Sequence, residues 1–76
     1  MLATALRSLG TVLRESGRSE AAVPLIEEAV ALSESTGDRR LIVRSLIDQG
    51  TLLRQLGRFE AAAAALERAL VSVGEF

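Results

Sequence analysis

Arginine is the residue type in this 76-residue sequence with the clearest capacity for recognition chemistry. All nine basic residues are arginine, and polar residues gather around them at helical spacing. The candidate binding residues lie in two stripes, Arg7, Thr11 and Arg14 in the first and Arg44, Asp48, Thr51, Arg54 and Gln55 in the second. Arg18 continues the first stripe at the turn, and Arg40 and Arg58 share the second. Because a guanidinium group binds a carboxylate through two parallel hydrogen bonds, the stripes indicate a surface for acidic or carboxylate-terminated peptides. They are equally consistent with the charged, wet side that any surface helix needs.

The sequence offers no catalytic centre. It contains neither His nor Cys, so the commonest general base and the thiolate nucleophile are both absent, and with them the usual metal ligands. The adjacent acids Glu27 and Glu28 diverge by about 100° around a helix, and no hydroxyl residue has a base at a suitable spacing. The glycines do not form a phosphate-binding motif. We therefore predict no enzymatic activity, no cofactor and no metal site.

Composition narrows the classes of partner. A net charge of −1 and an aromatic content of 3% argue against nucleic-acid binding, which needs dense positive charge and stacking surfaces. No apolar run approaches the roughly 18 residues that span a bilayer, so no membrane partner is expected. The first residues lack the basic region of a signal peptide, which predicts a cytoplasmic protein. The length allows one small domain, residues 1–76.

Hydrophobic periodicity predicts four helices joined by short turns. Their expected ranges are about Leu2–Ser16, Ser19–Ser35, Arg39–Leu56 and Phe59–Val73. Gly17, Gly37 and Gly57 should end the first three, because glycine adopts the left-handed conformation without steric cost. Ser19 and Asp38 are the candidate N-caps of the second and third helices. Connections this short require consecutive helices to pack antiparallel.

Each predicted helix has an apolar face that should point inward. The expected faces are Leu2, Leu6, Leu9 and Leu13; Ala22, Ile26, Ala29 and Ser33; Ile42, Leu46, Gly50 and Leu53; and Ala62, Leu66, Ala69 and Val73. Gly10 and Gly50 lie in the middle of helices, where glycine costs about 1 kcal/mol relative to alanine. A glycine at such a position usually allows another backbone to come close. We therefore expect Gly50 to lie where the third helix meets the fourth, near Ala62.

The chain repeats itself after 40 residues. The segment Leu13–Ala22 returns as Leu53–Ala62, and Gly10 returns as Gly50. The first repeat covers about residues 3–36 and the second about 43–76, so each repeat is one helix pair.

These residues resemble the tetratricopeptide repeat (TPR) family, which pairs a large and a small residue in its first helix, places glycine at the turn, and uses small residues in its second helix. The matching residues are Leu9, Gly10, Gly17, Ala22 and Ala29 in the first copy, and Gly50, Gly57, Ala62 and Ala69 in the second. The sequence departs from the family in three ways: Gln49 replaces the large apolar residue, no proline follows either second helix, and the period exceeds the usual 34. Longer variants of this kind occur in kinesin light chains and in bacterial signalling regulators.

The resemblance implies an all-α fold of two antiparallel helix pairs in a short right-handed superhelix, as part of a longer array. The first helix of each pair would line a concave groove, so both arginine stripes would face one partner. Formal charges by segment agree, with +1 and +2 on the first helices and −3 and −1 on the second helices. The expected function is protein–protein interaction, with a peptide or partner protein bound in the arginine-lined groove.

Two other interpretations remain open at this point. Stable arrays usually need three or more repeats with polar caps, and only two are present here. The chain could therefore self-associate as a homo-oligomer through an uncovered apolar face containing Leu66, Leu70 and Val73, with Phe76 beyond. A two-fold dimer, formed end to end or by exchange of a helix pair at the turn 36–38, is then the expected form. Alternatively, the chain is a fragment of a bacterial regulatory protein.

Overall fold

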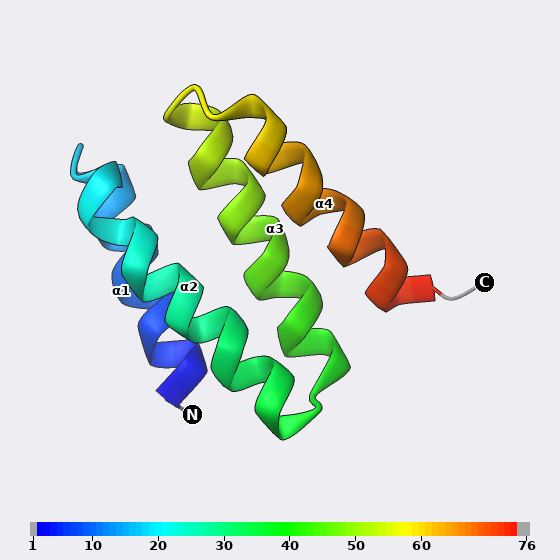
Figure 1. Cartoon of the computed structure of the whole chain (residues 1–76). Helices are drawn as coiled ribbons and strands as arrows, with labels where there is room; N and C mark the ends of the chain where they lie inside the picture. Colours follow the sequence, from blue (N-terminus) through cyan, green and yellow to red (C-terminus); the bar gives the residue numbers. More distant parts are fainter. Residues whose placement is uncertain (1, 75–76) are drawn as a thin grey trace.

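The computed structural model contains four α-helices and describes residues 2–74 (Figure 1). The helices are α1 (Leu2–Glu15), α2 (Ser19–Thr36), α3 (Arg39–Gln55) and α4 (Phe59–Gly74). The all-α fold is thus confirmed, and every predicted helix end agrees to within about a residue. Phe76, the predicted end of the second repeat, lies outside the described residues. Among residues 2–74, none of the helices is long and apolar enough to cross a membrane.

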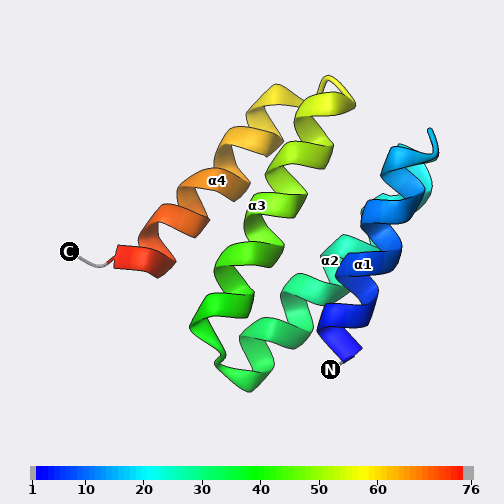
Figure 2. The same ribbon diagram turned by 180° about the vertical axis from the view of Figure 1, so that it is seen from behind.

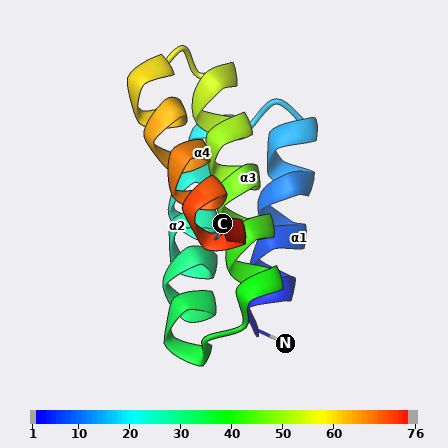
Figure 3. The ribbon, with the colours of Figure 1, turned by 90° about the vertical axis from the view of Figure 1, so that its right-hand side faces the viewer.

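The helices form two antiparallel pairs placed side by side. In Figures 1 and 2, α1 lies against α2 and α3 against α4, while α2 and α3 are neighbours across the middle. The extents of the molecule are 36 × 28 × 14 Å, so it is a thin slab. Viewed from its side, α2 and α4 lie toward one surface of the slab and α1 and α3 toward the other (Figure 3). This arrangement places the first helix of each repeat on a common side.

Both within-repeat turns have the same geometry. Gly17 and Gly57 adopt φ values of 85° and 80°, in the left-handed region that glycine enters without strain. In the first turn, the amide of Arg18 donates a hydrogen bond of 2.7 Å to the carbonyl of Leu13. The equivalent bond of the second turn, from Arg58 to Leu53, is 2.9 Å long. These bonds close the last turn of α1 and of α3, so each helix must fold back at once into its partner.

One of the two predicted N-caps is correct. Asp38 caps α3, and its Oδ1 accepts a hydrogen bond of 3.2 Å from the amide of Leu41. The prediction for Ser19 was wrong, because α2 begins one residue earlier than a serine cap would require. Arg18 occupies the cap position without a side-chain hydrogen bond, and its carbonyl accepts from the Ala22 amide. The tight bond from Arg18 back to α1 leaves Ser19 already inside the helix.

The mid-helix glycines bring the two helices of each pair into close contact. A Cβ on Gly10 would lie 2.6 Å from Cδ1 of Ile26. A Cβ on Gly50 would lie 2.6 Å from Cγ of Leu66 and 3.3 Å from the carbonyl oxygen of Ala62. Both distances to side-chain carbons are shorter than any normal contact, so neither position accepts even alanine without movement. The expected place of Gly50, beside Ala62, is confirmed.

The core lies where the two repeats meet. Ala22 and Ile26 of α2 pack with Leu52 of α3 in one buried cluster. Val30 of α2 packs with Leu46 and Ala69 in a second cluster, so α2, α3 and α4 share it. Burial of each large side chain in these clusters contributes about 1.5–3 kcal/mol. The stability of each repeat therefore depends on the presence of the other.

Two of the predicted inward faces are only partly right. The faces of α2 and α3 are confirmed, since all four α2 residues are buried and Ile42, Leu46, Gly50 and Leu53 are buried or half-buried. On α1, however, Leu2 and Leu9 are exposed and Ala3 and Gly10 are buried. On α4, Ala62 and Ala69 are buried while Leu66 and Val73 are exposed. In both helices small residues are the most deeply buried. Leu66 still packs against Gly50 of the partner helix, although much of its side chain is exposed.

A pair of serines is buried between the repeats. Ser33 of α2 and Ser45 of α3 are both fully buried, and their hydroxyl oxygens are 3.3 Å apart. The Ser33 hydroxyl donates its hydrogen to the carbonyl of Ala29 at 2.7 Å. Because a hydroxyl carries only one hydrogen, Ser45 must be the donor between the two serines.

We expect leucine to destabilise both mid-helix glycine sites, by different amounts. Gly50→Leu should lower the free energy of unfolding by about 1–3 kcal/mol through overpacking. Gly10→Leu should cost more, because Ile26 is enclosed in the core whereas Leu66 lies at an open edge and can move outward. Urea unfolding monitored by circular dichroism measures both, with the exposed Ala61→Leu as control. Equal stability of the Gly50 variant and the parent chain would show that the α3–α4 contact is wrong.

The serine pair should respond asymmetrically to alanine. Ser33→Ala removes the acceptor of the Ser45 hydroxyl and leaves a buried donor unsatisfied, at a cost of about 1–3 kcal/mol. Ser45→Ala should cost less, because Ser33 keeps its bond to Ala29. The double variant should be less destabilised than the sum of the two single variants, which a double-mutant cycle of unfolding free energies tests. Strict additivity would contradict the hydrogen bond.

Candidate functional site

An ion pair joins the two first helices of the repeats. Nε of Arg7 in α1 donates to Oδ2 of Asp48 in α3 at 2.7 Å. Only 18% of the Arg7 side chain and 28% of the Asp48 side chain are exposed, so the pair is largely shielded from water. Both residues were predicted to bind a partner. The structure instead commits the Nε hydrogen of Arg7 to a carboxylate within the chain.

The first turns of α3 carry the densest group of arginines. Arg39, Arg40 and Arg44 line an open hollow together with Val43 and Val73. Arg40 and Arg44 also line a second hollow, between α1 and α3, whose other lining residues are Thr4, Arg7, Asp38 and Leu41. The two hollows therefore adjoin along Arg40 and Arg44. Among residues 2–74, neither of these arginines makes an ion pair.

The remaining predicted residues of α1 lie toward α3. Thr11 and Arg14 border a small enclosed space with Asp48 and Leu52. The Thr11 hydroxyl donates to the carbonyl of Arg7 at 3.0 Å, so it can still accept a hydrogen bond but has no hydrogen to give. Arg14 is half-buried and lies on the same side as the Arg7–Asp48 pair.

The second half of α3 continues the polar row. Thr51 is half-buried, and Arg54 and Gln55 are exposed. Arg54 lies ten residues after Arg44, which is about 15 Å along the helix axis. The predicted stripe is therefore not one compact site. The structure brings Arg7, Arg44 and Asp48 together and leaves Arg54 and Gln55 at a distance.

The sequence placed Arg40 on the second polar stripe, but neither Arg40 nor Arg39 was selected as a binding residue. The spacing of Arg40 one turn before Arg44 was the available signal, since residues four apart share a helix face. Arg39 has no arginine four residues after it, so the spacing gave no reason to place it on the same helix face. The positive end of the α3 dipole lies beside Arg39 and Arg40, in the first turn of the helix, and adds to their attraction for an anion.

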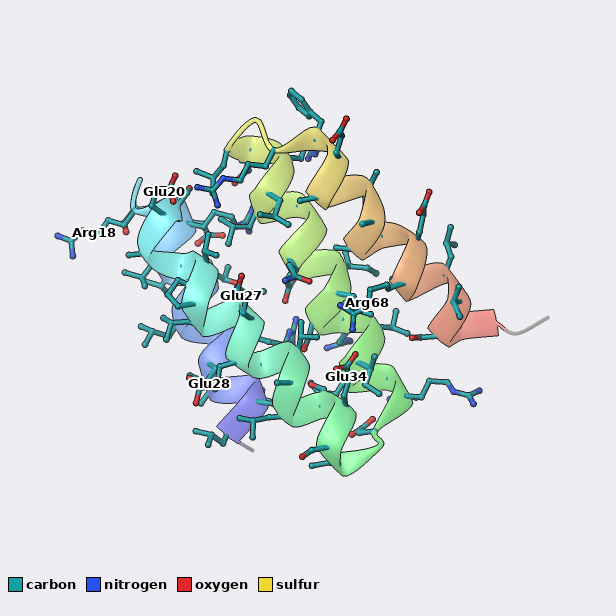
Figure 4. All side chains as sticks on the ribbon, viewed as in Figure 1. Arg18, Glu20, Glu27, Glu28, Glu34 and Arg68 are labelled. Carbon is teal, nitrogen blue, oxygen red and sulfur yellow. The ribbon has the colours of Figure 1, made fainter. Side chains whose placement is uncertain are left out.

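The opposite side of the slab is acidic. In Figure 4, Glu27 and Glu28 extend to opposite flanks of α2, and Glu20 and Glu34 lie toward its two ends. Two of these acids are paired: Glu20 accepts from Arg58 at 3.0 Å, and Glu34 accepts from Arg68 of α4. The two surfaces therefore differ in their excess of charge, although each carries both signs: Arg58 and Arg68 pair with glutamates on this side, and Asp48 pairs with Arg7 on the other.

The residues predicted for an oligomer interface lie close together. Leu66, Leu70 and Val73 of α4 line an apolar hollow with Ala69 and with Val43 and Ile47 of α3. The side chains are exposed, with Leu70 at 64% and Val73 at 54%. The hollow lies on the outer edge of the second repeat, away from the first.

Comparison with known proteins identifies one family. The family model described as tetratricopeptide repeat matches residues 1–70. No curated protein and no solved structure matches the chain.

The Arg7–Asp48 pair should stabilise the contact between the repeats. A double-mutant cycle with Arg7→Gln and Asp48→Asn should give a coupling energy of about 1 kcal/mol, high for an ion pair because both side chains are shielded. The exposed pair Arg58–Glu20 is the control and should couple more weakly. Added salt should reduce the coupling energy of the exposed control pair more than that of the shielded Arg7–Asp48 pair. A coupling energy near zero for Arg7 and Asp48 would show that they do not interact.

Proposed function

We propose that this chain, which belongs to the tetratricopeptide repeat family, binds an acidic peptide segment of a partner protein along the α1 and α3 side. Tetratricopeptide repeats generally mediate protein–protein interaction, and the repeats typically act as non-enzymatic scaffolds. The observation that carries the finer proposal is the position of Arg40 and Arg44. They border both hollows of this side and have no ion-pair partner among the described residues.

The shape of the surface favours an extended ligand over a compact one. Arg40 and Arg44 are separated by one helical turn, about 6 Å, so one carboxylate can lie between them or two neighbouring carboxylates can each take one. Arg14 and Arg54 extend the positive row along the two helices. An extended peptide crossing from the first turns of α3 toward Arg54 would meet guanidinium groups at both ends of its path, with Asp48 between them.

The apolar side chains that line the same hollows indicate which kind of residue lies next to the acidic residue of the ligand. Val43 and Val73 lie beside Arg40 in one hollow, and Leu41 lies beside it in the other. A ligand with carboxylates alone would leave these side chains uncovered. The surface is therefore best matched by a segment with an apolar residue next to its acidic residue or its terminal carboxylate.

Asp48 is expected to weaken the binding of an acidic ligand at this site. Its carboxylate holds Arg7 and places a negative charge beside the groove. Loss of that charge would release the guanidinium of Arg7 and remove repulsion of an incoming acid. Asp48 thus acts as an internal competitor for the ligand.

The proposal predicts opposite effects of two charge changes. A fluorescent peptide with a Leu-Glu-Glu end and a free terminal carboxylate is titrated with dilute protein, and anisotropy reports binding. Replacing both Arg40 and Arg44 by Gln should weaken binding by about tenfold or more, because hydrogen bonds between charged groups are lost. Asp48→Asn should strengthen binding instead. Raising the salt concentration should weaken binding of the parent chain.

The control variant removes the same charge from the other side of the slab. Arg18→Gln with Arg68→Gln alters two arginines of the acidic surface and should leave the affinity unchanged (Figure 4). A second peptide with an amidated C-terminus distinguishes the contribution of the terminal carboxylate to binding from that of the glutamates. Equal losses in the two double variants would show that binding is non-specific, and no loss in the Arg40 and Arg44 variant would end the proposal.

A further inference from the structure

The same repeat positions are buried in the first repeat and exposed in the second. Ile26 is 2% exposed and Val30 is 5% exposed, whereas their equivalents Leu66 and Leu70 are 38% and 64% exposed. α3 covers these residues of the first repeat. Within residues 2–74, nothing covers the corresponding face of the second repeat, which we call the acceptor face (Val43, Ile47, Leu66, Leu70, Val73).

The first helices show the complementary difference. Leu52 of α3 is 2% exposed because it packs on Ala22 and Ile26. Its equivalent in α1 is Val12, which is 58% exposed. Ser45 of α3 is likewise buried against the first repeat, while its equivalent on α1, Ala5, is exposed. The exposed apolar residues of α1 form the donor face (Leu2, Ala5, Leu9, Val12).

The donor and acceptor faces are thus the two halves of the contact between the repeats. They lie at opposite ends of the slab, with α1 at one end and α4 at the other (Figures 1 and 2). We infer that copies of this chain stack head to tail, with the donor face of one copy on the acceptor face of the next. The second copy would sit on α3 and α4 as α3 itself sits on the first repeat.

The residues that would meet in this stack are chemically matched. Where Ile26 meets Leu52 within the chain, Leu66 would meet Val12 of the next copy. The buried serine pair, Ser33 and Ser45, is replaced by its equivalents Val73 and Ala5.

The shielded ion pair is replaced as well. The equivalents of Arg7 and Asp48 are Ile47 and Ser8, so no charge would be buried between the copies. Both buried polar contacts of the internal interface thus become apolar or neutral in the stack. No carboxylate or guanidinium has to lose water without a partner.

Charge complementarity supports the same arrangement at the edge. Within the chain, Arg58 donates to both carboxylate oxygens of Glu20, at 3.1 and 3.0 Å. The repeat equivalents of this pair are Arg18 and Glu60, both exposed and unpaired among the described residues. Figure 4 shows Arg18 extending away from the molecule at the end that carries α1. In the stack, Arg18 of one copy would reach Glu60 of the next.

The contact differs from the two-fold dimer considered from the sequence. Its two sides are different surfaces, so each added copy leaves one donor face and one acceptor face at the ends. Such heterologous contacts produce rings when the rotation closes and open stacks when it does not. The stack does not depend on peptide binding and does not use Arg40 or Arg44. It would, however, cover Val43 and Val73, which also line one of the two hollows of the proposed peptide site.

Two charge substitutions test the stack by complementation. Val12→Glu blocks the donor face and Leu70→Glu blocks the acceptor face, and both positions are already exposed, so helicity should persist. Sedimentation equilibrium of the 76-residue chain should show a mass that rises from micromolar to millimolar concentration. Each variant alone should weaken association about tenfold or more. Their equimolar mixture should form a heterodimer, because one intact donor face can meet one intact acceptor face.

A matched control uses another exposed valine of α4. Val71→Glu lies outside the acceptor face and should associate like the parent. A two-fold contact through α4 predicts instead that Val12→Glu still dimerises and that mixing restores nothing. That result, or a parent chain that stays monomeric at millimolar concentration, overturns the inference.

A charge exchange tests the register. Arg18→Glu and Glu60→Arg should each weaken association a few-fold, since exposed ion pairs contribute little. The chain carrying both changes should regain the parent affinity, because opposite charges would again face each other across the contact. Failure of the double variant to recover, while both single variants are weakened, would show that these residues do not meet.

Discussion

The close approach of paired helices at Gly10 and Gly50 is the constraint on which the rest of this structure depends. At each site the partner side chain occupies the space that a Cβ would need, with contacts of 2.6 Å. Because the helices touch there, the small residues of α1 and α4 face the partner helix and large residues lie on the flanks. Residues on these flanks, such as Leu52 and Leu66, are available to contact a neighbouring repeat instead. Tight pairing within a repeat thus creates the surface for stacking between repeats.

Stacking of the repeats in turn separates the charges. With α1 and α3 on one side and α2 and α4 on the other, the arginines of the first helices and the glutamates of α2 face different surroundings (Figures 3 and 4). The contact between the repeats also pairs two charged side chains with each other, because Arg7 and Asp48 form an ion pair across it. The positive surface that remains centres on Arg40 and Arg44. The binding surface that we propose is therefore a consequence of how the repeats are joined.

Local sequence rules predicted the elements well and their orientation less well. The left-handed glycines at the turns and the Asp38 cap act through neighbouring residues, so they could be recognised without tertiary information. The Ser19 cap failed because a hydrogen bond from Arg18 back to Leu13 shifts the start of α2. The prediction of the inward face of α1 was partly wrong for a different reason. Its apolar stripe is wider than one contact needs, and periodicity does not distinguish the residues that touch α2 from those that face a further neighbour.

The amino-acid sequence by itself determined the repeat, the four helices, their antiparallel pairing and the family, because each follows from spacing within about 40 residues. Only the tertiary structure decided which arginines are available. Arg7 meets a carboxylate 41 residues away, and Arg40 and Arg44 come to line hollows shared with other elements. The tertiary structure also decided which equivalent residues are covered, with Val30 buried and Leu70 exposed. The two repeats have the same pattern of apolar residues along the chain. The burial of each residue depends instead on which element packs against its repeat in the folded structure.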